Sequence, residues 1–290
     1  MYEFKAPLLI VIEVTGNCNL HCKYCYAKSG CTSEYIDTST IKSIVDESAE
    51  LGVFDINICG GEPFLHDDIF EIISYIKSKG IDISLNTNAT LIDKNNAIRL
   101  QQLDIIKNIQ VSFDSHIENI HNKTRGMFAE AFKGFKLLCE HSSDGLQPIV
   151  GIVLNKYNFD TILDSIMFFS DYTKRFHIMN VMKNKHLELT DTQKDKFTHE
   201  ILPQLRNLSL TNSISISQFK KHNIDFSLNS AHIDCLAGYT FIAITSSLDI
   251  VPCDIARKSI IKYRKYGDIS VGYNKAKRLW KSRKIEWCKE

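Results

Sequence analysis

The stretch Cys18-Asn19-Leu20-His21-Cys22-Lys23-Tyr24-Cys25 places three cysteines at C-x3-C-x2-C spacing, directly after the apolar run 8–14. Three thiolates on one loop cannot all pair as disulfides, but they can hold three corners of a metal cluster. Ligand softness and thiolate number favour a [4Fe–4S] cluster. Zinc is the alternative, although a structural zinc site usually takes four ligands from two separated pairs. His21 could be a fourth ligand only if the chain folded back sharply, so both alternatives stay open here.

Composition is that of an ordinary globular protein, with 44% hydrophobic and 24% charged residues in 290. The run 8–14 is too short for a signal peptide and is interrupted by Glu13. No apolar run approaches the ~20 residues that span a bilayer. Nine cysteines without an export signal are therefore expected as thiols or metal ligands in the cytoplasm, with no membrane partner.

The charge is distributed unevenly. From Arg257 to Glu290 there are twelve Lys and Arg against three Asp and Glu, a net of +9, whereas the other 256 residues carry 23 basic and 31 acidic side chains, a net of −8. Such a segment is either a solvated basic face or a docking surface for something acidic, such as a peptide or nucleic acid.

Apolar periodicity predicts an alternation of strands and helices through the first two thirds of the chain. Strands are predicted at 8–14, 55–59, 81–85, 109–113, 149–154 and 176–181, and helices at 38–51, 67–78, 94–103, 129–140, 162–172 and 192–208. Thr38 or Ser39, and Thr190 or Asp191, are predicted helix caps. Six β-then-α units imply parallel strands and an α/β fold, a partial (β/α)6 TIM-like barrel.

The unusual polar and glycine-rich segments all follow predicted strands. They are the cysteine loop, Gly60–Pro63, Asn86–Asn88 and Asp114-Ser115. In a barrel the loops after the strands converge at one face, where the chemistry is found. We therefore expect one site built from these loops.

After residue 208 the rhythm changes. Residues 213–219 alternate in polarity, and 239–245 with 248–251 predict a hairpin that turns at Ser246-Ser247. We predict two domains, the partial barrel at 1–208 and a small α+β domain at 209–290.

The cysteine motif, an aromatic residue before its third cysteine, and the segment Gly60-Gly61-Glu62-Pro63 together resemble the radical S-adenosylmethionine (AdoMet) superfamily over residues 8–185. The resemblance implies that Cys18, Cys22 and Cys25 hold a [4Fe–4S] cluster with one open iron, which the methionine part of AdoMet chelates. Reductive cleavage of AdoMet then gives a 5′-deoxyadenosyl radical that abstracts a substrate hydrogen.

The resemblance also implies an AdoMet pocket. Gly60–Pro63 would bind the methionine ammonium. Tyr24, Val153 and Asn155 would lie near the adenine, and the fourth-strand residues Ser112 and Asp114 near the ribose and carboxylate. The residues so implied are Tyr24, Gly60, Gly61, Glu62, Pro63, Asn86, Asn88, Ser112, Asp114, Val153 and Asn155.

The C-terminal part resembles the SPASM/twitch subgroup, which implies an auxiliary cluster held by Cys235, Cys253 and Cys288. The sequence departs from the pattern because no C-x-x-C partner follows Cys253. The three cysteines would then hold one auxiliary cluster with an open iron, or Cys31 or Cys139 would supply a fourth ligand. Alternatively, Cys288 is a free thiol. Cys31 is also a candidate hydrogen donor, while Cys59 and Cys139 are expected in the core.

We predict an enzyme that modifies a ribosomally made peptide by epimerisation or by a C–C or C–S crosslink. Its basic C-terminal segment would suit an acidic leader, and no separate leader-binding domain is expected before the first strand. A flavodoxin or ferredoxin is the expected electron donor, and nucleic acid is not an expected partner of this enzyme. The alternatives are oxidation of a small molecule or of a protein Ser or Cys, and, from another class, a non-catalytic iron–sulfur or zinc protein that binds nucleic acid.

Overall fold

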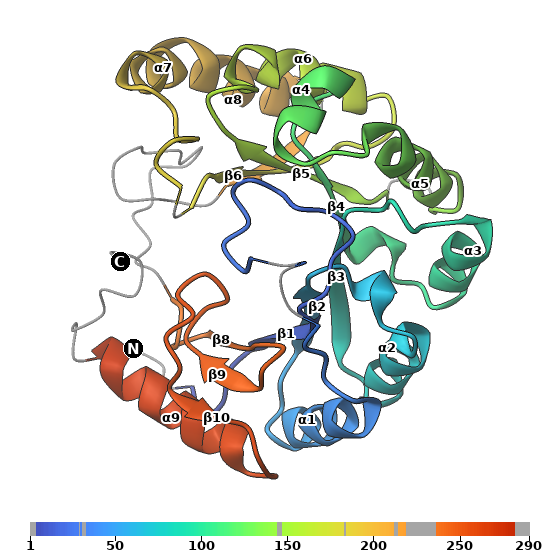
Figure 1. The fold of residues 1–290 in the computed structure, drawn as a ribbon, viewed down its shortest axis with the longest axis vertical. Helices are drawn as coiled ribbons and strands as arrows, with labels where there is room; N and C mark the ends of the chain where they lie inside the picture. The colour runs from blue at the N-terminus through green and yellow to red at the C-terminus, as the bar shows by residue number, and fades with distance from the viewer. Residues whose placement is uncertain are drawn as a thin grey trace. The chain divides into compact units, whose positions relative to one another are not determined.

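The computed structural model describes residues 4–28, 30, 33–143, 147–182, 184–211, 214–218 and 236–281 (Figure 1). The chain divides into two compact units. The first unit comprises Met1–His21, Cys25–Asn86 and Asp234–Glu290, and the second comprises Cys22–Tyr24 and Thr87–Ile233. Among the described helices, none is long and apolar enough to cross a membrane.

The first unit contains a mixed sheet with the strand order β10-β9-β8-β1-β2-β3. Its elements are β1 (Leu9–Thr15), α1 (Thr38–Glu50), β2 (Asp55–Gly60), the 3₁₀ helix Pro63–Leu65, α2 (Ile69–Ser78), β3 (Asp82–Thr87), β8 (Phe241–Ile244), β9 (Asp249–Val251), β10 (Ile261–Lys262) and α9 (Asp268–Lys281). β1 pairs in parallel with β2 and β8, and β2 pairs in parallel with β3. β9 is antiparallel to both β8 and β10.

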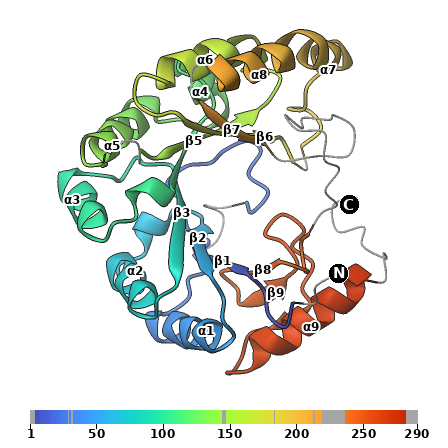
Figure 2. The ribbon, with the colours of Figure 1, turned by 180° about the vertical axis from the view of Figure 1, so that it is seen from behind.

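The second unit contains a parallel sheet with the order β4-β5-β6-β7. Its elements are α3 (Lys94–Gln102), the 3₁₀ helix Ile106–Asn108, β4 (Ile109–Phe113), α4 (Glu118–Thr124), α5 (Phe128–Glu140), β5 (Ile149–Leu154), the 3₁₀ helix Phe159–Thr161, α6 (Ile162–Phe169), β6 (Arg175–Asn180), α7 (Asp191–Lys196), the π-helical stretch Phe197–Ile201, α8 (Leu202–Thr211) and β7 (Ser215–Gln218). In Figure 2, α5, α6 and α8 lie along one side of this sheet.

The six predicted strands are all present, and β1 is buried almost along its whole length, as a continuous apolar run predicts. The hairpin at Ser246-Ser247 is confirmed by the antiparallel pairing of Ala243 with Val251. The prediction that Cys59 is packed in the core is confirmed, whereas Cys139 on α5 is only partly buried.

Two predictions about helix ends differ in outcome. Asp37, and not Thr38 or Ser39, caps α1, because its carboxylate accepts from the backbone N–H of Thr40 at 2.9 Å. Thr190 caps α7 in a complete capping box with Gln193, as one of the two predicted alternatives required. The sequence did not predict α4 or α9.

Candidate functional site

The cysteine loop leaves the carboxyl end of β1. Cys18 and Cys25 belong to the first unit and Cys22 to the second. All three are partly exposed, and none of the six cysteines that the structure describes forms a disulfide. The backbone N–H of Leu20 donates to Cys18 Sγ at 3.4 Å.

The donor set fits an iron–sulfur cluster, since it offers three soft thiolates at short spacing. Within the described part of the chain, no three His, Cys, Asp or Glu side chains are arranged around a single metal ion. The thiolates of a cluster bind different irons, so the assignment of Cys18, Cys22 and Cys25 depends on the donor chemistry and the spacing.

The turn that follows β2 is pressed against the start of the cysteine loop. Gly61 N–H donates to Thr15 O at 2.7 Å, and Glu62 N–H donates to Asn17 O at 2.8 Å. A Cβ on Gly61 would lie 1.8 Å from Asn17 O, and one on Gly60, where φ is +124°, would lie 2.3 Å from Thr15 O. Only glycine allows this approach, so Gly60 and Gly61 are required by the backbone itself.

Glu62 and Pro63 turn the chain into a short 3₁₀ helix. Glu62 caps it, with its side chain accepting from the Phe64 N–H at 3.3 Å, and Pro63 occupies the first turn. Glu62 is almost completely buried. A buried carboxylate is stable only where hydrogen-bond donors compensate for its desolvation, and the Phe64 N–H is one such donor.

In the second unit, Tyr24 and Asp114 meet in a buried cluster that includes Arg125. The Tyr24 hydroxyl donates to the Asp114 carboxylate at 2.6 Å, and Arg125 Nε lies 2.9 Å from Asp114 Oδ1. The Thr124 hydroxyl donates to Asp114 Oδ2 at 2.5 Å. Burial raises the pKa of Tyr24 well above its usual value, so this phenol stays protonated and donates. The Asp114 carboxylate is thus bound by three side chains of the protein itself.

Arg125 connects this cluster to the cysteine loop. Its guanidinium lies 5.2 Å from the centre of the Tyr24 ring, and Nη1 is 4.0 Å from Cys22 Sγ. The backbone N–H of Lys23 donates to Thr124 O at 2.9 Å. Sequence reasoning missed Arg125 and Thr124, because α4, which ends at Thr124 just before Arg125, has no clear apolar period.

Tyr24 also belongs to a small apolar cluster with Val181 and Leu187, against which Cys22 and Val153 pack. Tyr24 and Val153 were both predicted to lie near the adenine. The structure brings these two side chains into one cluster beside Cys22.

The remaining predicted residues hold turns at strand ends. Asn88 Oδ1 accepts from Thr90 N–H at 2.9 Å, and buried Asn155 donates to Val153 O at 2.9 Å. Asn86 makes a long contact of 3.5 Å with Asn57 Oδ1, and Ser112 is partly exposed on β4. These contacts describe local turns and leave the predicted roles as predictions.

Cys253 is the only predicted auxiliary-cluster cysteine within the described residues, since Cys235 and Cys288, like Cys31, lie outside them. Its thiol is buried, and burial raises its pKa above the usual range. The next residue, Asp254, accepts a short hydrogen bond from the hydroxyl of Tyr26, which follows Cys25.

The same part of the first unit holds a second pair that the sequence did not indicate. Arg257 Nη1 lies 2.5 Å from Glu13 Oε1, and Glu13 is buried on β1. Burial raises the pKa of Glu13, although Arg257 opposes this effect. A glutamate inside the apolar run 8–14 was the available signal, because a buried charge there needs a partner.

The chain is an α/β protein of mainly parallel strands, with a loop of three cysteines after its first strand. Residues 12–169 match the model of the Radical SAM superfamily, which is more than half of the chain. The chain belongs to this superfamily, and membership implies a [4Fe–4S] cluster and AdoMet as cofactors.

The chain is 34% identical, over 151 residues, to the antilisterial bacteriocin subtilosin biosynthesis protein AlbA of Bacillus subtilis (strain 168). The match covers 48% of this chain and 32% of AlbA, so the chain spans about a third of that relative.

Two solved structures share the fold. Streptococcus suis SuiB bound to precursor peptide SuiA has a TM-score of 0.74 at 19% identity, covering 93% of this chain and 65% of SuiB. Native anSMEcpe with bound AdoMet and Cp18Cys peptide has a TM-score of 0.67 at 20% identity, covering 98% of this chain and 88% of anSMEcpe. These likenesses confirm the predicted α/β class, a partial TIM-like barrel.

Proposed function

We propose that this chain cleaves AdoMet reductively at a [4Fe–4S] cluster held by Cys18, Cys22 and Cys25, and uses the radical to modify a peptide. The observation that carries the proposal is the packing of Gly60 and Gly61 against the entry of the cysteine loop. This packing joins the motif expected to hold the methionine ammonium to the loop that supplies the thiolates.

When bound, a reduced cluster supplies the electron that breaks the sulfonium C–S bond of AdoMet and releases the 5′-deoxyadenosyl radical. The chain's own residues bind AdoMet and orient it for this cleavage. Glu62 and the backbone of residues 60–63 hold the ammonium, and Tyr24 with Val153 gives an apolar surface for the adenine. Asp114 fixes Tyr24 and Arg125 through its buried hydrogen bonds. Asn86, Asn88, Ser112 and Asn155 are assigned to the polar edge of the pocket.

A peptide substrate is supported by the relatives. AlbA is a bacteriocin biosynthesis protein, and the SuiB structure contains a precursor peptide. We assign the reaction to epimerisation or to a C–C or C–S crosslink. A flavodoxin or ferredoxin is the proposed electron donor.

A second cluster is proposed at Cys235, Cys253 and Cys288. Cys253 would have to lose its proton to bind iron, which couples metal binding to pH, because burial raises its pKa in the metal-free protein.

A second candidate is oxidation of a Cys or Ser side chain in a peptide. The observation that favours it is the likeness to anSMEcpe with its Cp18Cys peptide, which covers 98% of this chain and 88% of that one. An aldehyde-specific hydrazide label separates the two candidates, because oxidation of the side chain gives an aldehyde, whereas neither epimerisation nor a C–C or C–S crosslink does.

Anaerobic reconstitution with iron and sulfide, followed by dithionite and AdoMet, tests the proposal. We expect release of 5′-deoxyadenosine, and we expect its loss when Cys18, Cys22 and Cys25 are all replaced by alanine. The triple variant should still bind about four irons per chain if the auxiliary cluster exists. An iron-loaded wild-type protein that releases no 5′-deoxyadenosine would falsify the proposal and favour a non-catalytic iron–sulfur protein.

Gly61→Ala tests the observation that carries the proposal. The new Cβ would meet Asn17 O at 1.8 Å, and overpacking of this kind costs about 1–3 kcal/mol. We expect AdoMet cleavage to fall at least about tenfold. Gly52→Ala is the matched control, because φ is +74° there but nothing lies within 4 Å. It should lower the melting temperature and leave cleavage unchanged; equal losses in the two variants would remove the special role of Gly61.

A further inference from the structure

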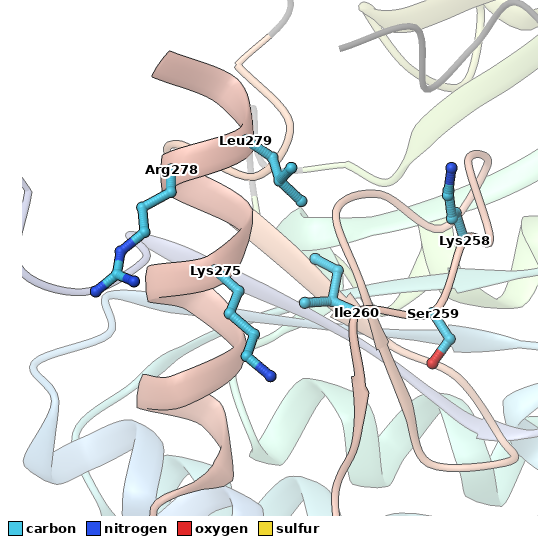
Figure 3. Close-up of a pocket in the computed structure, with 6 residues that line it drawn as sticks. All are labelled: Lys258, Ser259, Ile260, Lys275, Arg278 and Leu279. Atoms are coloured by element: carbon cyan, nitrogen blue, oxygen red, sulfur yellow. The ribbon is translucent and has the colours of Figure 1, made fainter. Parts of the chain in front are cut away.

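A pocket on the first unit lies between α9 and the loop that joins β9 to β10. Its volume is about 380 Å³, and it is lined by Lys258, Ser259, Ile260, Lys275, Arg278 and Leu279. In Figure 3, Lys275 and Leu279 point from α9 toward Ile260, whereas Arg278 leaves the helix on its other side. This pocket takes no part in the site described above.

The charge around this pocket is positive. Lys258, Lys275 and Arg278 are exposed, and none of the ion pairs between described residues includes them. Two acidic side chains of the same part of the chain, Asp249 and Asp268, already have partners. Asp249 lies 3.0 Å from Lys262 Nζ and accepts from the Ser259 hydroxyl at 2.7 Å, while Asp268 accepts from the backbone N–H groups of residues 264 and 265.

The walls between the cations are aliphatic. Ile260 and Leu279 line the pocket alongside the charged side chains. Ser259 is the one neutral side-chain donor among the described residues that line the pocket, and it donates its hydroxyl proton to Asp249. Cations that alternate with aliphatic surface suit carboxylate side chains separated by aliphatic ones, which is the chemistry of an acidic amphipathic peptide.

We propose that this pocket docks an acidic segment of the peptide substrate outside the residues that react. Carboxylates of that segment pair with Lys258 and Lys275 at the pocket and with Arg278 on the other side of α9, and an aliphatic side chain packs on Ile260 and Leu279. The inference rests on the proposed function for the peptide substrate, but binding at this pocket requires neither cluster nor AdoMet. It assigns a binding role to three of the basic side chains between residues 257 and 281.

The test uses the full chain and a fluorescein-labelled synthetic peptide with the repeat Leu-Glu-Glu, and fluorescence anisotropy reports binding. The same peptide with Gln in place of each Glu is the ligand control. The pocket variant carries Lys275→Gln and Arg278→Gln. The matched variant carries Arg264→Gln and Lys265→Gln, which removes the same two kinds of charge from the same segment at exposed residues outside the pocket.

We expect the acidic peptide to bind wild type, with an affinity that falls as salt rises because the pairs are exposed. The pocket variant should bind roughly tenfold more weakly, as expected for the loss of two exposed pairs, and the matched variant should bind as wild type does. Leu279→Ser should weaken binding without any change of charge.

Three results would overturn the proposal that this pocket docks an acidic peptide. They are no binding of the acidic peptide by wild type, equal losses in the pocket and matched variants, or a labelled single-stranded DNA 12-mer that binds as tightly and depends on the same residues. Release of 5′-deoxyadenosine, measured on the same preparations, reports the proposed function separately. If the enzyme releases 5′-deoxyadenosine but the acidic peptide does not bind at the pocket, only the docking proposal is wrong.

Discussion

At the residue scale, the buried polar side chains near the cysteine loop are satisfied mainly by one another. Asp114 is fully buried and receives hydrogen bonds from Tyr24, Thr124 and Arg125. The sequence singled out Tyr24 and Asp114, but it could not pair them, because 90 residues separate them. Their partner Arg125 became visible only in the structure.

Two histidines, the buried His121 and the partly buried His177, make stability depend on pH. Burial lowers the pKa of His177 and of His121 from 6.5 to about 4. His121 accepts from the Asp114 N–H through Nδ1 and faces Gly126 O with Nε2, so the neutral ring fits its site. The unfolded chain binds protons on these rings at pH values where the folded chain does not, so stability falls as pH drops from 6.5 to about 4.

We expect each histidine to cost about 3 kcal/mol of unfolding free energy over that interval. His177→Gln should remove roughly half of this combined pH dependence, measured by urea unfolding of metal-free protein between pH 4 and 7. His199→Gln is the control, because its side chain is exposed. A His177→Gln profile that stays parallel to wild type would contradict the assignment.

At the scale of elements, the strands were predictable because their apolar runs are continuous, and β4 and β5 match the predicted bounds residue for residue. Helix α4 was missed because Glu118–Thr124 is short and mostly polar. Helix α9 was missed because its apolar residues are interrupted by polar and charged ones and a glycine, Gly272, lies within it.

Gly272 explains how closely α9 packs on β9. A Cβ at this position would lie 2.9 Å from Ile250 Cγ2. In an isolated helix, alanine is favoured over glycine by about 1 kcal/mol, whereas overpacking costs about 1–3 kcal/mol. We expect Gly272→Ala to destabilise the protein by about 1 kcal/mol in urea unfolding, because the steric effect exceeds the propensity gain.

A double-mutant cycle with Ile250→Ala checks the cause. Ile250→Ala alone should cost about 2–5 kcal/mol as a core truncation. In that background Gly272→Ala should become stabilising, since the side chain that it met is gone. Additive costs would show that the contact with Ile250 is not the reason for the glycine.

At the scale of the whole molecule, the C-terminal segment completes the sheet of the first unit. β8 pairs in parallel with β1 from Leu9–Phe241 to Ile12–Ile244. Tyr273 on α9 is fully buried and donates to Tyr239 O at 2.8 Å, and Glu47 on α1 accepts from Ile269 N–H at 2.9 Å. Removing this segment would expose an edge of β1 and part of the core.

The boundary predicted between residues 208 and 209 stays a prediction, and truncation tests it. We expect the fragment 1–208 to aggregate or to lack a cooperative thermal transition, because β1 loses a paired neighbour. Circular dichroism and size-exclusion chromatography of the fragments 1–208 and 209–290 give the answer. Two monomeric fragments that each unfold cooperatively would support separate domains and overturn this expectation.

The sequence by itself determined the class of fold and predicted the chemistry of the cysteine loop. Both depend on local signals, namely continuous apolar runs that predict parallel strands and three thiols at fixed spacing that predict a cluster. Only the tertiary structure decided which polar groups pair and why particular glycines are needed. Examples are the contacts of Tyr24 with Asp114, of Arg257 with Glu13 and of Gly61 with Asn17, each of which joins segments distant in the chain. Such contacts arise from packing, and no short-range pattern encodes them.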